Sequence, residues 1–206
     1  MRYEIPAPDA ILPACRVLPV IVVRETTEVN GILSALLDGG VGCVEITFRT
    51  DCAADAIRHA TEQFPGVCVG AGTVINAGQA EIALSCGAKF IVSPGFSDEI
   101  AAVCGERGVP YLPGCVTPTE IMHAIDCGIT TVTYTAGCLP SGHWRRPSRR
   151  FAFCRRGGSD LTICAVTCPV TGSQLSAGAF FAGAISAQIA AGLPAFLRRR
   201  YRICAS

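Results

Sequence analysis

A carboxylate and a guanidinium lie four residues apart in an apolar, β-branched stretch of this chain. The stretch, over residues 43–50, contains Glu45, Thr47 and Arg49. Side chains alternate along a strand, so we expect all three on the buried, interior face. A carboxylate is costly to bury unless it is paired or used. Glu45 and Arg49 could therefore act on a substrate, with Arg49 binding a carboxylate through two hydrogen bonds, or form a salt bridge that only holds the structure.

Turns rich in glycine and proline follow three further apolar runs. Gly70-Ala71-Gly72-Thr73 closes one run, and two glycines there would let a ligand approach the backbone, although a plain packing role fits equally. Thr73 adds a hydroxyl group. The next two runs end in Ser93-Pro94-Gly95 and in Leu112-Pro113-Gly114. We expect all of these turns at one end of the fold.

The elements that would position these residues repeat along the chain. Apolar runs at 18–23, 41–48, 67–74, 88–93, 109–113 and 129–134 alternate with helical patterns at 27–37, 53–63, 77–85, 97–107 and 117–126. This alternation predicts a parallel sheet covered on both faces. No glycine fingerprint follows the first run, which favours a closed α/β fold of the TIM-type (β/α)8 barrel class over a doubly wound sheet.

The repeat stops after Tyr134, where a basic segment begins instead of another apolar run. We therefore expect one barrel domain over residues 1–206 that is regular through about the sixth strand. The last two strands are doubtful, and residues 133–206 are divergent.

Composition excludes several classes of protein. Half of the 206 residues are hydrophobic and the net charge is +1, so we expect a real core and no nucleic-acid partner, despite the basic run near Trp144.

The thirteen cysteines form no Cys-x-x-Cys pair and the three histidines are isolated, so we expect no metal. No signal peptide is recognisable, which predicts a cytoplasmic protein with free thiols. The apolar stretch 176–197 is only a weak membrane candidate, and we expect no membrane partner.

Five motifs in order resemble consecutive strands of the 2-keto-3-deoxy-6-phosphogluconate (KDPG) and 4-hydroxy-2-oxoglutarate (KHG) aldolases. They are LPVIVV (18–23), VEITFRT (44–50), GAGTV (70–74), FIVSPG (90–95) and LPGCVTPTE (112–120), and the likeness covers about residues 7–132. The resemblance implies a class I aldolase without a cofactor, in which a lysine forms an imine with a small keto-acid substrate and pyruvate is released. It also implies a homotrimer.

The same resemblance assigns roles to individual residues. Glu45 matches the proton-shuttling carboxylate of the family, and Arg49, Thr73 and Pro94 match positions around the pyruvate half of the substrate. Gly157 and Gly158 could bind phosphate through backbone N–H groups, or simply belong to an improvised loop.

The imine lysine is missing from the matching position, which is Thr133. A hydroxyl group does not form an imine. The sole lysine, Lys89, begins the fourth run, roughly 15 Å below Pro94 at ~3.3 Å per residue. The alternative is therefore an inactive barrel that at most binds small keto acids.

We expect a frame shift near residues 133–140 to explain the divergent end. In another frame, codons for residues 151–159 are compatible with the Arg-Phe-x-Pro-Thr-Gly-Gly loop of the family. The nucleotide sequence, read in the shifted frame, should encode that loop and a sixth strand bearing lysine. A shifted frame that lacks either feature would contradict the hypothesis.

Overall fold

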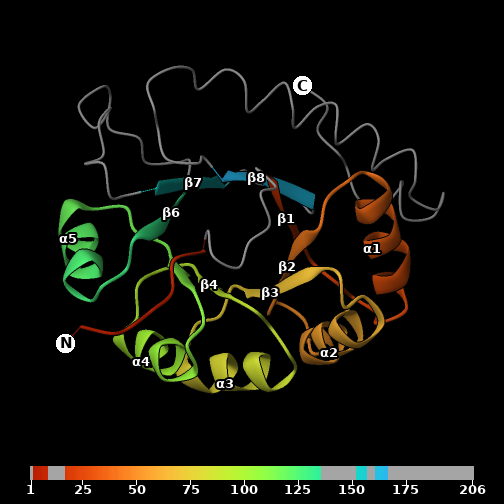
Figure 1. Ribbon diagram of the computed structural model, residues 1–206, viewed down its shortest axis with the longest axis horizontal. Coiled ribbons are helices and arrows are strands. Elements are labelled where there is room, and N and C mark those ends of the chain that lie inside the picture. The colour runs from red at the N-terminus through yellow and green to blue at the C-terminus, as the bar shows by residue number, and fades with distance from the viewer. Residues whose placement is uncertain (1, 9–16, 136–151, 157–160, 167–206) are drawn as a thin grey trace.

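Thirteen helices and strands make up the described part of the chain in a computed structural model (Figure 1). The structure describes the backbone of residues 2–8, 17–135, 152–156 and 161–166, and the side chains of 2–8 and 18–133. In chain order the elements are β1 (Val17–Ile21), α1 (Glu28–Asp38), β2 (Cys43–Thr47), α2 (Ala53–Gln63), β3 (Cys68–Gly72), α3 (Ala77–Ser85), β4 (Ile91–Ser93), α4 (Asp98–Arg107), β5 (Tyr111–Pro113), α5 (Pro118–Asp126), β6 (Thr131–Thr135), β7 (Ala152–Arg156) and β8 (Leu161–Val166).

The strands close into a barrel, as the sequence predicts. Their order is β5-β4-β3-β2-β1-β8-β7-β6. The two ends of this series meet through a parallel bridge between Gly114 and Thr133, where the Cys115 N–H donates to the Thr133 carbonyl over 3.0 Å. Figure 1 shows α1 to α5 on the outside of the ring of strands. The alternative that the sequence analysis disfavoured, an open doubly wound sheet, is thereby excluded.

One strand departs from the parallel pattern. β7 runs parallel to β6, but β8 is antiparallel both to β7 and to β1, with Val17 paired to Ala165 and Ile21 to Leu161. Only residues 157–160 separate β7 from β8, whereas a parallel connection needs a crossover of about a dozen residues. The short connection therefore forces β8 to run backwards, so the departure from a regular parallel barrel falls in the last two strands, which the sequence analysis left in doubt.

The helices bury one face each against the barrel. In α1 the side chains of Val29, Ile32, Leu33 and Leu36 are at most 3% exposed, at the spacing that the sequence predicts. Leu37 is instead 43% exposed, because it lies about 100° around the helix from Leu36. Each predicted helix lies within one residue of its observed bounds.

The ends of the helices follow from local sequence. α4 ends at Gly108, which adopts a left-handed conformation with φ of 63°, the conformation that glycine accepts without steric cost. At the start of α5, the Thr117 hydroxyl accepts a hydrogen bond from the Glu120 N–H. The Glu120 carboxylate accepts hydrogen bonds from the Thr117 and Val116 N–H groups, and these two bonds lower the pKa of Glu120. The reciprocal pair of Thr117 and Glu120 is a capping box.

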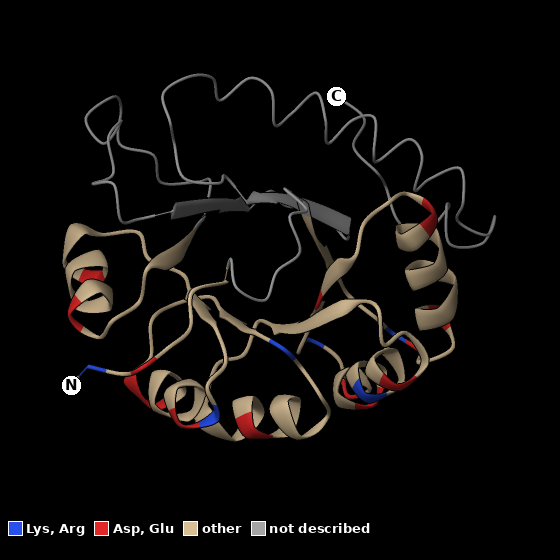
Figure 2. Cartoon of the chain, viewed as in Figure 1, with Lys and Arg blue, Asp and Glu red and all other residues tan. Residues whose placement is uncertain are grey.

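Charges of both signs are scattered mainly over the outer helices and loops (Figure 2). The seven cysteines within residues 18–133, where the side chains are described, are free and buried or half-buried. Within those segments no helix is both long and apolar enough to cross a membrane. The apolar stretch 176–197 and the basic run near Trp144 lie outside them.

The capping box gives a stability prediction. We expect Thr117→Ala to lower the free energy of unfolding by about 1 kcal/mol, because the Glu120 N–H loses its acceptor. Urea denaturation followed by circular dichroism measures the change. Thr119→Ala, inside the same exposed first turn, is the matched control and should change stability by less than about 0.5 kcal/mol. Equal effects of the two substitutions would show that the cap does not stabilise α5.

Candidate active site at the barrel mouth

Glu45 lies in the middle of β2 and its side chain is only 1% exposed. Its cross-strand partner on β3 is Gly70, and Thr47 is paired with Gly72. A methyl group at Gly72 would overlap the Glu45 carboxylate, and one at Gly70 would overlap the ring of Phe90. The two glycines therefore make room inside the barrel for these side chains. The sequence left a ligand-approach role and a packing role open, and the geometry supports packing.

Arg49 lies beyond the end of β2, in a turn, and is exposed. The sequence pattern had extended the strand through this residue, but β2 stops at Thr47, where the Arg49 N–H turns back to the Thr47 carbonyl over 2.9 Å. Arg49 and Glu45 form no ion pair among the described side chains, so the structural salt bridge is not present. The guanidinium instead donates from Nε to the Thr73 hydroxyl over 3.2 Å.

Thr73 holds an unusual backbone conformation directly after β3. Its φ is 56°, in the left-handed region that is costly for a β-branched residue. Such strain persists where the surrounding structure enforces it, and it concentrates at functional sites. The hydrogen bond from Arg49 ties this strained turn to the turn after β2. Two of the sequence-predicted site residues are thus brought together at the carboxyl ends of adjacent strands, where barrel enzymes carry their chemistry. We call this end of the barrel the mouth.

Pro94 follows β4 at the same end of the barrel and is exposed. A methyl group at Gly114 would overlap the Pro94 carbonyl, so the turns after β4 and β5 lie in close contact. Beneath them, the Tyr111 hydroxyl is 2.7 Å from the Ser93 hydroxyl and accepts a hydrogen bond from the Ser97 N–H. Burial raises the pKa of Tyr111, which therefore stays neutral. The sequence analysis missed this network, although both hydroxyl residues lie in recognised runs.

Thr133 lies on β6 and is 3% exposed, at the position that the resemblance gives to the imine lysine. Its carbonyl accepts the Cys115 N–H that closes the barrel. The Cys115 thiol is no substitute nucleophile, because burial raises its pKa to about 12 and keeps it protonated.

Lys89 lies at the opposite end of the strands. Its N–H donates to the Val69 carbonyl, and its charge acts on the Cys68 thiol at the start of β3, where it partly opposes the rise in pKa that burial causes. Four residues of β3, roughly 13 Å at ~3.3 Å each, separate Val69 from Thr73. The expectation that Lys89 lies far from the mouth agrees with this geometry. Gly157 and Gly158 lie outside the described residues.

Asp98, His123 and Cys127 form a second chemically capable cluster, outside the barrel mouth. The sequence analysis expected no metal site because it looked for paired cysteines and treated the histidines as isolated. The overlooked signal is His123-x-x-x-Cys127, which places both side chains on one face of a helix. Asp98, 25 residues earlier, could be added only by the packing of α4 beside α5.

The sequence of this chain matches one protein family. The model of the KDPG and KHG aldolases matches residues 9–142. The chain is similar to the 2-dehydro-3-deoxy-phosphogluconate aldolase of Treponema pallidum, with 41% identity over 131 residues, which are 64% of this chain and 62% of the relative. For the KHG/KDPG aldolase of Escherichia coli K12, identity is 39% over 121 residues, 59% and 57% of the two chains. The match thus spans about three fifths of these relatives' length.

The solved structures that align with this chain include aldolases of the same family. The crystal structure of 2-keto-3-deoxy-6-phosphogluconate aldolase from Zymomonas mobilis aligns with a TM-score of 0.68 and 30% identity, over 75% of this chain and 77% of the other. KDPG aldolase from Legionella pneumophila, captured with pyruvate as a covalent carbinolamine, aligns with a TM-score of 0.59 and 33% identity, over 62% of each chain.

The position of the Glu45 carboxylate can be tested by adding one methyl group at Gly72. We expect Gly72→Ala to lower the free energy of unfolding by about 1–3 kcal/mol, because the carboxylate must leave its position. Chemical denaturation measures the change. Gly95→Ala is the matched control: it lies in a turn at the same mouth, its new methyl group meets nothing within 4 Å, and it should have little effect. Wild-type stability of Gly72→Ala would mean that the carboxylate lies elsewhere.

Proposed function

This chain belongs to the KDPG and KHG aldolase family, and on that premise we propose that it is a class I aldolase. The proposed reactions are cleavage of KDPG to pyruvate and glyceraldehyde 3-phosphate, and cleavage of 4-hydroxy-2-oxoglutarate to pyruvate and glyoxylate. The observation that supports the proposal is the arrangement of three residues at the barrel mouth. A buried carboxylate, Glu45, lies on the strand that leads to an exposed guanidinium, Arg49, which is tied to the strained Thr73.

In the proposed mechanism, Arg49 binds the substrate carboxylate. The hydrogen bond to Thr73 uses Nε, and within the described residues neither terminal nitrogen of Arg49 has a partner. A carboxylate can therefore approach them with two parallel hydrogen bonds. The Arg49–Thr73 contact would hold the guanidinium in one orientation, which reduces the conformational freedom lost when the substrate binds. Pro94, on the facing turn, would contact the pyruvate half.

Glu45 is proposed to move the protons of the carbon–carbon cleavage. An imine at C2, which must come from an amine other than residue 133, would accept the electrons of the C3–C4 bond as it breaks, while a base removes the proton of the C4 hydroxyl and an aldehyde leaves. The resulting enamine must then receive a proton at C3. One carboxyl group held in a water-poor lumen can take the first proton and return one to carbon.

A second candidate function is a barrel that binds keto acids without cleaving them. The observation that favours it is Thr133, which has no amine for the imine at the family's lysine position. The distance of Lys89 from the mouth supports the same alternative. In this candidate Arg49 and Thr73 keep their binding role, and Glu45 has no proton to move.

Assembly and location are proposed from the family as well. We propose a homotrimer in the cytoplasm that acts on a small keto acid and has neither a nucleic-acid nor a membrane partner. Met122 and Ile125 on α5 support an assembly, since they are 64% and 47% exposed and offer apolar surface to another copy.

Borohydride reduction in the presence of pyruvate tests the covalent step. We expect Thr133→Lys to gain close to one equivalent of pyruvate adduct at residue 133, measured by peptide mass spectrometry. We also expect KDPG cleavage to rise on the order of a hundredfold, the lower range for one catalytic group. Thr133→Arg is the matched control, because it carries the same charge but forms no imine. Circular dichroism verifies that both variants fold.

The outcomes separate the two candidates. An adduct on the unsubstituted chain, located at Lys89, supports an aldolase that uses another amine. An adduct only in Thr133→Lys supports the keto-acid-binding barrel for the sequence as it stands. If the unsubstituted chain gains no adduct, and Thr133→Lys folds but traps no more pyruvate than Thr133→Arg, the mouth does not bind keto acids as proposed, and both candidates are wrong.

A further inference from the structure

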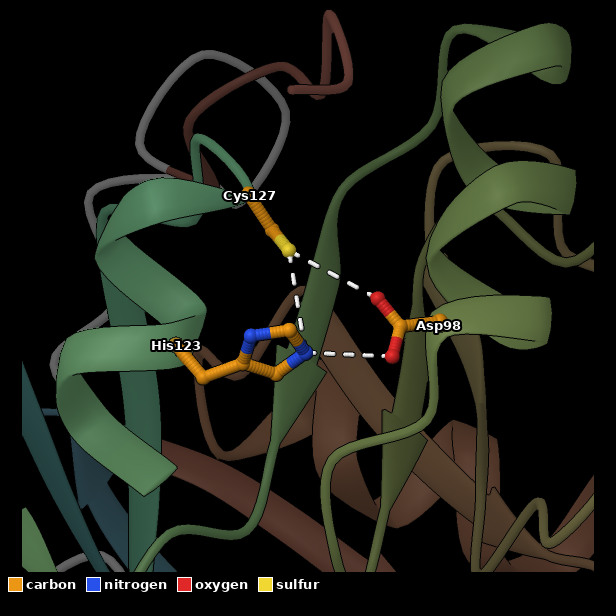
Figure 3. Close-up of side chains that lie close together, drawn as sticks. All are labelled: Asp98, His123 and Cys127. Atoms are coloured by element: carbon orange, nitrogen blue, oxygen red, sulfur yellow. Dashed lines mark hydrogen bonds and ion pairs between the residues drawn. The ribbon is translucent and has the colours of Figure 1, made fainter. Parts of the chain in front are cut away.

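Three side chains of different chemistry meet between α4 and α5 (Figure 3). Asp98 is the first residue of α4, His123 lies on α5, and Cys127 directly follows that helix. The His123 Nε2 atom is 3.0 Å from Asp98 Oδ2, and the Cys127 thiol is 3.7 Å from Asp98 Oδ1 and 4.0 Å from His123 Nε2. Figure 3 shows the polar ends of all three pointing toward a common space.

The geometry argues against a cysteine nucleophile activated by histidine. In such a relay the two ring nitrogens have different partners, one facing the thiol and the other the carboxylate. Here Asp98 and Cys127 both face Nε2 of His123. Burial and Asp98 also raise the pKa of the Cys127 thiol, which is the opposite of activation. The cluster therefore converges on one point instead of forming a chain of proton transfers.

Convergence on one point is what a metal ion requires. Oxygen, nitrogen and sulfur ligands at 2.0–2.3 Å from a tetrahedral zinc ion lie roughly 3.3–3.6 Å from one another. With a single Asp98 oxygen as the ligand, the three ligand atoms all lie within 4.8 Å of one another, so no separation exceeds those values by more than about 1.5 Å. Rotations of the side chains would bring all three atoms into a first coordination sphere.

The surroundings hold the three groups in place. The ring of Phe96 packs edge-on against His123, with centroids 4.8 Å apart. The Tyr3 N–H donates to the Cys127 carbonyl over 2.9 Å, which ties the N-terminal segment to the end of α5. Cys127 is 1% exposed, whereas the side chains of Asp98 and His123 are 58% and 48% exposed. An ion can thus enter from solvent and reach a sulfur atom buried beneath.

We propose that Asp98, His123 and Cys127 bind a divalent transition-metal ion of the zinc type. A thiolate and an imidazole select such ions and disfavour magnesium and calcium, which prefer sets of oxygen ligands. Three protein ligands leave a fourth position for water or another small ligand. The ion would link α4 to α5, and this role is independent of chemistry at the barrel mouth.

Cobalt(II) is the probe that tests the proposal, because it reports thiolate coordination by its absorption. The full chain, freed of metal and kept reduced, should bind one equivalent with a sulfur-to-cobalt charge-transfer band and strong visible bands of a tetrahedral site. Zinc should displace the cobalt and raise the midpoint of thermal unfolding. We expect Cys127→Ser to lose the charge-transfer band, and His123→Gln and Asp98→Asn to weaken binding by about tenfold or more.

Matched controls are needed because the chain has thirteen cysteines that could bind metal nonspecifically. Cys68→Ser and His59→Gln alter a free thiol and a histidine outside the cluster, and both should bind cobalt as the unsubstituted chain does. A charge-transfer band unchanged in Cys127→Ser would overturn the proposal, as would the absence of cobalt binding. If Cys127→Ser does not fold, Asp98→Asn decides the test, because it changes an exposed side chain and should weaken cobalt binding in a folded chain.

Discussion

The narrow interior of an eight-stranded barrel is the constraint on which the rest of this structure depends. Such a barrel is just wide enough for its own side chains to fill. Glu45 from β2 and Phe90, just before β4, project toward β3, and they fit because β3 presents Gly70 and Gly72 on its inner face. A side chain at either glycine would displace one of them. The positions of Glu45 and Phe90 thus depend on two glycines on the neighbouring strand.

Closure of the ring depends on a second constraint, which is the number of residues available between strands. The β/α units up to β6 each have enough chain for a helical crossover, so their strands run in parallel. The four residues between β7 and β8 do not allow this, and β8 completes the sheet in the opposite direction. The ring closes through main-chain contacts of β7 and β8 with their neighbours.

The outer layer of helices holds a second cluster of polar side chains. α4 and α5 meet outside the barrel, and their packing creates the Asp98, His123 and Cys127 cluster. The elements that position the mouth also position this cluster, because α4 follows the turn of Pro94 and the ring of Phe96 contacts His123. A single framework thus positions two candidate sites of different chemistry, one at the strand ends and one between helices.

The sequence alone determined the order of the helices, their bounds to within one residue and the closed barrel, because periodicity depends on neighbours within a few residues. It also identified Glu45, Arg49, Thr73 and Pro94 as candidates through motifs at strand ends. Only the tertiary structure decided that Arg49 contacts Thr73 instead of Glu45, that β8 is inverted, and that Asp98 reaches His123 and Cys127. These contacts join residues far apart in the chain, so their geometry follows from packing and from strand ends that no local pattern specifies.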